Sequence, residues 1–240
     1  MRRLRLLLFT LFIMFIPVLL YSQPSCIFHL YGGLILPTGQ LGTNPSFIPS
    51  DNYYLENNYG MKLGINLLAV DFKLAVDKER HIRGVLGYNG NIFFNPKEIL
   101  NVIGMGVTVI RKNIEIHSFQ LGGEYAFTPK EKYCPFVGGA FTGNFISGDD
   151  FSSQVRYGLR LTCGVDITVK NKFGTVVGIS FDIANLIGKS TNINTLQYGT
   201  PHLPLNDDEF TLEGNTVKSK TISYFNFFLG FSLFLGQPDK

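Results

Sequence analysis

Residues 155–169 read VRYGLRLTCGVDITV, and this stretch decides the fold. Every second residue from Val155 to Val169 is apolar or aromatic, with Cys163 among them, whereas the residues between them are arginine, glycine, threonine and aspartate. Successive side chains of a strand point to opposite faces. The pattern therefore predicts one long β-strand with an apolar and a polar face.

The same alternation recurs along most of the chain, together with many β-branched and aromatic residues. It slips out of phase at Leu67 and Leu68, which predicts a β-bulge there. We expect eight strands, at about 26–37, 59–76, 81–94, 114–127, 133–145, 155–169, 174–186 and 221–235.

The connections between these segments alternate strictly in length. The second, fourth and sixth expected strands are followed by only 4, 5 and 4 residues, whereas the others are followed by 21, 19, 9 and 34. A barrel that crosses a membrane has long loops on one side and tight turns on the other. The expected fold class is therefore all-β, an eight-stranded antiparallel up-and-down transmembrane β-barrel.

The composition of the two faces indicates which of them is outside. The polar face consists mostly of glycine, serine and threonine with isolated charges, which suits a narrow lumen better than a solvated exterior. A soluble barrel of the lipocalin kind is the alternative, but the chain has no Trp for the Gly-x-Trp expected there. Aromatic residues near the strand ends predict interfacial girdles. These are Tyr59, Phe93, Phe94, Phe145 and Tyr157 on the loop side, and Tyr125, Phe127, Tyr133 and Phe173 on the turn side.

The first 23 residues have the features of a cleaved signal peptide. Arg2, Arg3 and Arg5 precede an apolar run over residues 6–20, and small Ser22 follows it. These arginines account for the whole net charge of +3, so the barrel domain expected at 24–240 is neutral, which disfavours nucleic-acid binding. Beyond residue 23 no apolar run is long enough for a spanning helix.

Several short motifs give the chain a family resemblance. They are Tyr31-Gly32-Gly33 with Pro37-Thr38-Gly39, then Leu121-Gly122-Gly123-Glu124-Tyr125, then Pro135-Phe136-Val137-Gly138-Gly139, and the aromatic last strand. With these, residues 24–240 resemble the eight-stranded outer-membrane β-barrel family, which includes OmpA-like, OmpX-like and OmpW-like barrels. The resemblance implies a Gram-negative outer membrane, periplasmic termini, contact with membrane lipid and lipopolysaccharide, and insertion by the barrel assembly machinery. Such barrels commonly end on an aromatic residue, whereas this chain runs five residues past Leu235.

Seven charged side chains are predicted to face the lumen: Lys62, Arg83, Glu124, Arg156, Arg160, Asp166 and Asp182. Unpaired charges are costly in a poorly hydrated interior, so we expect them to form ion pairs. One interpretation is a structural plug that fills a closed barrel. The other is a selectivity filter or a proton path.

The remaining features bear on function. Asp207, Asp208 and Glu209 cluster in the longest loop and form a candidate site for a cation or a protein partner. His117 and Ser118 are adjacent, but neighbours on a strand face opposite sides, so no nucleophile and base are predicted to meet. We therefore expect a structural or loop-mediated role, with no catalysis, cofactor or metal. A narrow channel, a component of a secretion or assembly apparatus, and a lipid-modifying enzyme are the alternatives.

Overall fold

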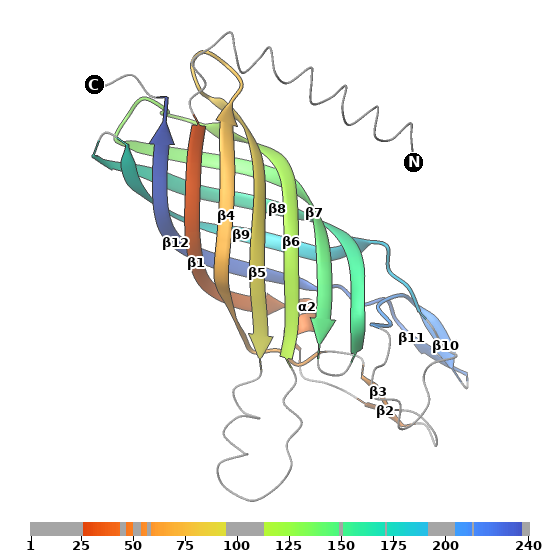
Figure 1. Cartoon of the computed structure of the whole chain (residues 1–240). Helices are drawn as coiled ribbons and strands as arrows, with labels where there is room; N and C mark the ends of the chain where they lie inside the picture. The colour runs from red at the N-terminus through yellow and green to blue at the C-terminus, as the bar shows by residue number, and fades with distance from the viewer. Residues whose placement is uncertain are drawn as a thin grey trace, which may run out of the picture.

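The computed structural model describes residues 26–43, 47–49, 54–56, 59–94, 113–148, 151–170, 172–191, 205–212 and 214–236. Eight antiparallel strands close into a barrel in the order β1-β12-β9-β8-β7-β6-β5-β4 (Figure 1). They are β1 (Cys26–Thr38), β4 (Leu63–Ala75), β5 (Ile82–Phe94), β6 (Asn113–Ala126), β7 (Tyr133–Gly148), β8 (Phe151–Lys170), β9 (Phe173–Ile187) and β12 (Ser223–Leu235). The expected fold class and all eight strands are confirmed. The predicted signal peptide lies outside the described residues.

The barrel closes because β1 pairs with β12 on one side and with β4 on the other. Cys26 lies opposite Leu235, so the first and last strands begin and end at the same end of the barrel as the short turns. We call this end the turn side and the opposite end the loop side. The register of β4 with β5 shifts between Asn66 and Leu68, which confirms the predicted bulge.

Further elements lie at the loop side and were not predicted from the sequence. They are the short helix α2 (Gly39–Gly42), the pair β2 (Phe47–Pro49) and β3 (Tyr54–Glu56), and the hairpin of β10 (Phe210–Leu212) and β11 (Asn215–Val217). Gly39, with φ of 54°, begins α2 in a conformation that side-chain-bearing residues rarely adopt. Gly42 approaches the Pro37 carbonyl so closely that a Cβ would lie 2.6 Å from its oxygen. Within the described residues, no helix has the length and hydropathy needed to cross a membrane.

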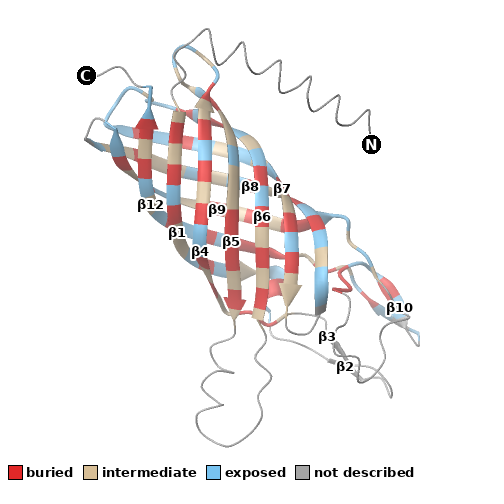
Figure 2. Cartoon of the chain, viewed as in Figure 1, coloured by how far each residue is buried: buried red, intermediate tan, exposed pale blue. Residues whose placement is uncertain are grey.

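Burial alternates along most of each barrel strand (Figure 2), and the exposed positions carry many large apolar side chains. Phe141 is 75% exposed and Leu161 and Leu229 are 62% and 67% exposed, whereas Arg83, Arg160 and Asp166 are almost completely buried. A soluble barrel would have the reverse arrangement. The outer wall is therefore apolar, and the buried charges lie in the lumen.

Two of the five residues predicted for the loop-side aromatic girdle lie elsewhere. Phe94, Phe145 and Tyr157 lie on the loop-side part of the wall, but Phe93 points into the lumen and is fully buried. Tyr59 is partly buried and packs with Phe93 in the same apolar cluster. The alternation within β5 puts Phe93 and Phe94 on opposite faces, so only one of them can face outward.

Candidate functional site: the barrel lumen

A cluster of charged side chains fills the turn-side half of the lumen, and we call it the turn-side cluster. Arg83 Nη1 on β5 donates to Glu124 Oε1 at 2.9 Å and to Asp166 Oδ2 at 2.8 Å. Lys73 Nζ on β4 donates to the other oxygen of Glu124 at 2.6 Å. His29 Nε2 on β1 lies 3.1 Å from Asp166 Oδ1, an ion-pair distance, although the alignment makes no hydrogen bond. All five side chains are buried, and each charge has a counter-charge in contact, as burial requires.

A second group of polar side chains, the central cluster, lies next to it. Gln120 connects one acid to one base, since its Nε2 donates to Asp71 Oδ1 and its Oε1 accepts from Arg160 Nη1 at 2.7 Å. Arg160 Nε donates to Asp182 Oδ1 at 2.6 Å. The Tyr31 hydroxyl donates to Asp71 Oδ2 at 3.0 Å. Five strands are thereby joined across the lumen.

A cavity of about 30 Å³ lies between the two clusters. Its lining includes His29, Lys73 and Glu124 from the turn-side cluster and Asp71 and Gln120 from the central cluster. A volume of this size holds about one or two water molecules. The cavity can therefore hydrate the buried charges but is too small for a solute.

The two clusters together are not balanced in charge unless a proton is added. The bases of the two clusters are Lys73, Arg83 and Arg160, and their acids are Asp71, Glu124, Asp166 and Asp182. Three bases face four acids, so the two clusters carry one excess negative charge when His29 is neutral. With His29 protonated beside Asp166 the count is four and four.

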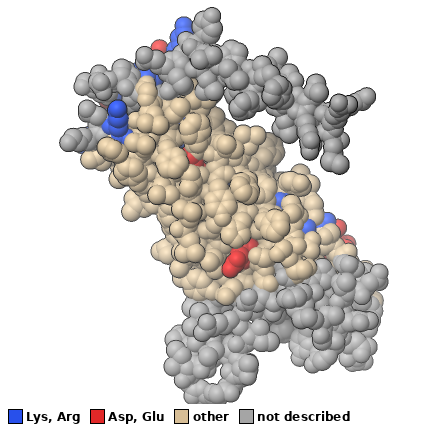
Figure 3. Space-filling view, in the orientation of Figure 1, with Lys and Arg blue, Asp and Glu red and all other residues tan. Residues whose placement is uncertain are grey.

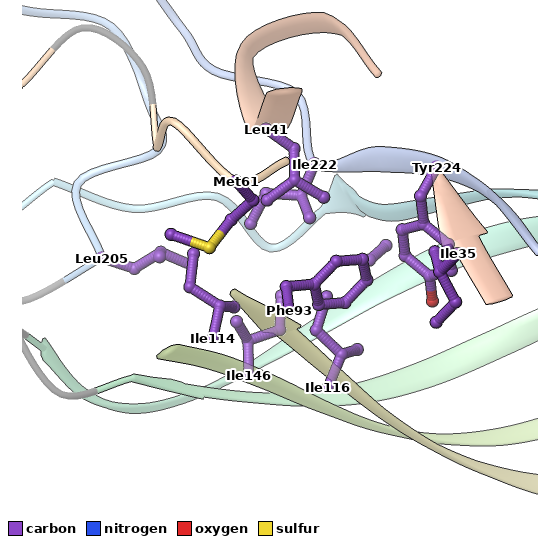
Figure 4. Close-up of a cluster of buried hydrophobic side chains, with 11 residues drawn as sticks. Ile35, Leu41, Met61, Phe93, Ile114, Ile116, Ile146, Leu205, Ile222 and Tyr224 are labelled. Atoms are coloured by element: carbon purple, nitrogen blue, oxygen red, sulfur yellow. The ribbon is translucent and has the colours of Figure 1, made fainter. Parts of the chain in front are cut away.

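The loop-side half of the lumen has a different composition: it is filled by apolar side chains (Figure 4). This cluster, here called the apolar plug, comprises Ile35, Leu41, Met61, Phe93, Ile114, Ile116, Ile146, Ala184, Leu205, Ile222 and Tyr224, all with at most 3% exposure. The rings of Phe93 and Tyr224 meet edge to face, with centroids 4.9 Å apart. The plug therefore closes the lumen where the loops begin.

Part of the plug comes from residues outside the eight strands. Leu41 belongs to α2, and Met61, Leu205 and Ile222 belong to the connections. Backbone hydrogen bonds hold these segments in the mouth: Met61 N donates to Leu41 O at 2.9 Å, and Ala184 N donates to Ile222 O at 2.8 Å. The loops thus fold inward and form the end wall of the lumen.

A buried ion pair anchors the last long loop beside the plug. Arg156 Nη2 on β8 donates to Asp207 Oδ1 at 2.8 Å, and Arg156 Nε lies 3.0 Å from Asp207 Oδ2. Asp207 also accepts from Asn185 Nδ2 at 2.8 Å and from the backbone N–H of Ser190 at 3.1 Å. Its carboxylate is completely buried. Asp207 therefore fastens the loop to the barrel wall.

The structure distributes the predicted site residues over three places. Arg83, Glu124 and Asp166 lie in the turn-side cluster, Arg160 and Asp182 lie in the central cluster, and Arg156 pairs with Asp207 at the loop side. Lys62 lies outside the network, because its Nζ donates to the Gly42 carbonyl at 3.0 Å and no ion pair is recorded for it among the described residues. Asp208 and Glu209 are exposed, so the three loop acids do not form one site.

Sequence reasoning missed three ionisable side chains of the lumen. Asp71 and Lys73 follow the bulge at Leu67 and Leu68, which moves the inward face of β4 by one residue. If the inward and outward residues of β4 had been exchanged after the bulge, both would have been assigned to the lumen. His29 stands among apolar residues of β1, where its inward position follows from the alternation of that strand.

The fold and the lumen define the class of protein. A closed eight-stranded barrel with an apolar exterior, charged side chains paired inside it and long loops at one end has the architecture of an outer-membrane β-barrel. Among the described residues, no group of three or more His, Cys, Asp or Glu side chains is arranged to hold a metal ion.

No protein-family model matches the sequence, and no curated protein is significantly similar to it. Among solved structures, Neisserial surface protein A (NspA) is similar, with 12% identity, a TM-score of 0.49, and coverage of 88% of this chain and 97% of that chain. The outer membrane protein OprG from Pseudomonas aeruginosa has 9% identity, a TM-score of 0.48, and coverage of 88% and 96%. The attachment invasion locus protein Ail of Yersinia pestis, in complex with the heparin analogue sucrose octasulfate, has 9% identity, a TM-score of 0.33, and coverage of 87% and 97%. At these identities and scores the likeness indicates nothing about the activity or partners of this chain.

Proposed function

We propose that this chain is an integral outer-membrane barrel with a closed lumen, which acts as a structural scaffold and presents its long loops to partners. The observation that carries the proposal is the apolar plug, because a conducting pore needs a continuous hydrated path. A plug of eleven buried side chains excludes water at the loop side. Below it, the ion pairs occupy the rest of the lumen.

The outer wall supports residence in a membrane. Soluble monomers rarely expose contiguous apolar patches larger than a few hundred Å². Here the outward positions of all eight strands are dominated by leucine, valine, isoleucine and phenylalanine, and many of these side chains are about half exposed. Lipid is the solvent in which such a wall is stable, and in bacteria barrels of this design occupy the outer membrane, with lipopolysaccharide around the loop-side rim.

Two measurements test the proposal at the level of the fold and the lumen. Protein extracted in detergent should migrate differently on a denaturing gel before and after boiling, and full solubility without detergent would contradict the membrane assignment. In planar bilayers the purified protein should give no steady open-channel steps. Steady steps from the wild-type protein, altered by Arg160→Ala and unaffected by Leu229→Ala on the outer wall, would support the channel alternative instead.

The loops are the proposed contact surface. The anchored Asp207 holds the segment before β10 against the barrel, and this leaves its neighbours Asp208 and Glu209 exposed. A rigid base with exposed acids suits recognition of a basic partner or a bound cation. An Asp208→Cys variant should react with a membrane-impermeant maleimide on intact cells, whereas Glu79→Cys at a short turn should react only after permeabilisation. The opposite labelling would overturn the proposed topology, and a wild-type control corrects for the three native cysteines.

A further inference from the structure

The apolar outer wall is interrupted at one place by ionisable side chains. Among the described side chains of the eight barrel strands, Glu115 and His117 on β6 are the only charged or imidazole groups at outward positions; the others face the lumen. Glu115 and His117 are 47% and 44% exposed. Figure 3 shows how few charged side chains the face of β4, β5 and β6 carries, with an acidic one toward its loop-side end.

These two residues form a cluster with an outward tyrosine of the adjacent strand. The Tyr88 hydroxyl on β5 lies 2.7 Å from His117 Nδ1, and the two rings are stacked with centroids 6.2 Å apart. His117 Nε2 lies 3.8 Å from Glu115 Oε2. Gly90 is the register partner of His117, and a Cβ there would lie 3.3 Å from the Tyr88 oxygen. The glycine thus leaves room beside the polar groups.

The cluster lies near the loop-side end of β6, where His117 is the register partner of Phe145, one of the aromatic residues expected to form the interfacial girdle. The next outward residue of β6 toward the middle of the wall is Phe119, and its ring centroid lies 5.3 Å from that of Tyr88. Toward the loops, Glu115 pairs in register with Ser147, and β6 begins two residues earlier at Asn113. A lipid can therefore lay its chains on the aromatic surface and its headgroup on Glu115.

The hydrogen-bonding pattern indicates which headgroup fits. If Tyr88 donates to His117 Nδ1, the imidazole proton is on Nε2 and faces Glu115, an assignment made from the partners. The open groups are then both Glu115 oxygens and the lone pairs of the Tyr88 oxygen, which are acceptors around a net negative charge. A primary ammonium supplies a positive charge and three donors. A quaternary ammonium has no donor, and a phosphate is repelled by the carboxylate.

We propose that Glu115, His117 and Tyr88 form a binding site for the primary-ammonium headgroup of a membrane lipid. The inference rests on the proposed membrane residence, since a barrel in water would not present this wall to lipid. Two lipids can carry the same group, an aminophospholipid and a lipid A that bears phosphoethanolamine.

Native mass spectrometry of the full-length protein folded in detergent tests the site. The protein is titrated with phosphatidylethanolamine and phosphatidylcholine of identical acyl chains, and separately with lipid A with and without phosphoethanolamine. The wild-type protein should prefer the amine-bearing member of at least one pair by about fivefold, the gain expected of an exposed, hydrogen-bonded ion pair. Whichever pair is discriminated identifies the source of the amine. Glu115→Gln should reduce the ratio to about one, and Tyr88→Phe should reduce it partly.

The control is Glu79→Gln, which removes an exposed acid at a short turn and should leave the ratio unchanged. The inference is overturned if the wild-type protein shows no preference, if Glu115→Gln retains it, or if Glu79→Gln loses it equally. It is also overturned if binding depends on Mg²⁺ and ignores the amine. The gel shift on boiling is recorded for each variant, so that loss of the barrel, which sinks the proposed function, is distinguished from a folded barrel without the preference.

Discussion

The two halves of the lumen solve the same problem, how to fill a narrow barrel, with opposite chemistry. On the turn side, ion pairs such as Arg83 with Glu124 and Asp166 span the interior. On the loop side the apolar plug does so, with Phe93 and Tyr224 at its centre. All residues of the turn-side cluster come from the barrel strands, whereas the plug recruits α2 and the loops.

The difference teaches where stability resides in each half. A buried ion pair contributes little compared with an apolar substitute, but losing one partner leaves a buried charge without compensation. An apolar cluster loses free energy in proportion to the volume removed. The turn-side half should therefore be intolerant of single charge removals, and the loop-side half sensitive mainly to size.

The largest effect is expected for Glu124→Leu. The variant leaves Lys73 and Arg83 with only Asp166 as a counter-charge in the turn-side cluster, and should lower the free energy of unfolding by about 3–5 kcal/mol. Urea unfolding in detergent micelles measures it. The double variant Lys73→Met with Glu124→Leu should recover much of the loss, because one charge of each sign is removed and Arg83 keeps Asp166. A single-variant change below about 1 kcal/mol would contradict the ion-pair interpretation.

Phe93→Ala in the plug should cost slightly less, about 3 kcal/mol, through the cavity that it leaves. The matched control is Phe141→Ala, because Phe141 is 75% exposed on the outer wall and its loss leaves no internal cavity. Equal losses from both variants in the same unfolding experiment would show that the plug is not a packed core.

Two buried tyrosines allow a finer comparison between a hydrogen bond to a charged group and one to a neutral group. The Tyr31 hydroxyl donates to the Asp71 carboxylate, whereas the Tyr224 hydroxyl accepts from the Asn91 amide at 3.0 Å. Hydrogen bonds to charged groups contribute more, so Tyr31→Phe should cost about 2 kcal/mol and Tyr224→Phe about 1 kcal/mol. The reverse order in unfolding midpoints would indicate that Asp71 is not charged in the folded barrel.

The sequence predicted much of the turn-side half of the lumen, because its residues lie on strands in which every second side chain points inward. Arg83, Glu124 and Asp166 are assigned inward by counting along single strands, and their pairing follows from the cost of burying them alone. Asp71 and Lys73 were missed because one extra residue in β4 reverses the phase for the rest of the strand.

The plug could not be predicted in this way. Leu41, Met61, Leu205 and Ile222 belong to no period-two segment, and their meeting depends on how separate connections fold back into the mouth. Asp207 illustrates the same limit: in the sequence it is one of three adjacent loop acids, and only the fold brings it to Arg156. Contacts between distant loops leave no local pattern to count.

The smallest effect is expected for a carboxylate in contact with solvent, that of Asp77. Its removal shows how much less stability is lost when the carboxylate contacts solvent than when it is buried in the lumen. Asp77 lies in the short turn between β4 and β5, and its oxygens accept from the backbone N–H groups of His81 at 3.1 Å and Ile82 at 2.7 Å. Slight burial would raise the pKa of Asp77, but these N–H groups outweigh it and hold the pKa below its ordinary value.

A lowered folded-state pKa means that the contribution of Asp77 to stability is present above the pKa of the unfolded chain, about 3.9, and is lost as the pH falls through the folded value. Asp77→Ala should therefore cost only about 0.5 kcal/mol at pH 7, because solvent screens the contact, and the cost should fade below pH 4. The free energy of unfolding of the variant and of the wild-type protein, measured at pH 7 and below pH 4, tests this difference, with Lys78→Ala as the exposed control. If Asp77→Ala costs as much as Glu124→Leu, the intolerance of the turn-side cluster does not come from burial.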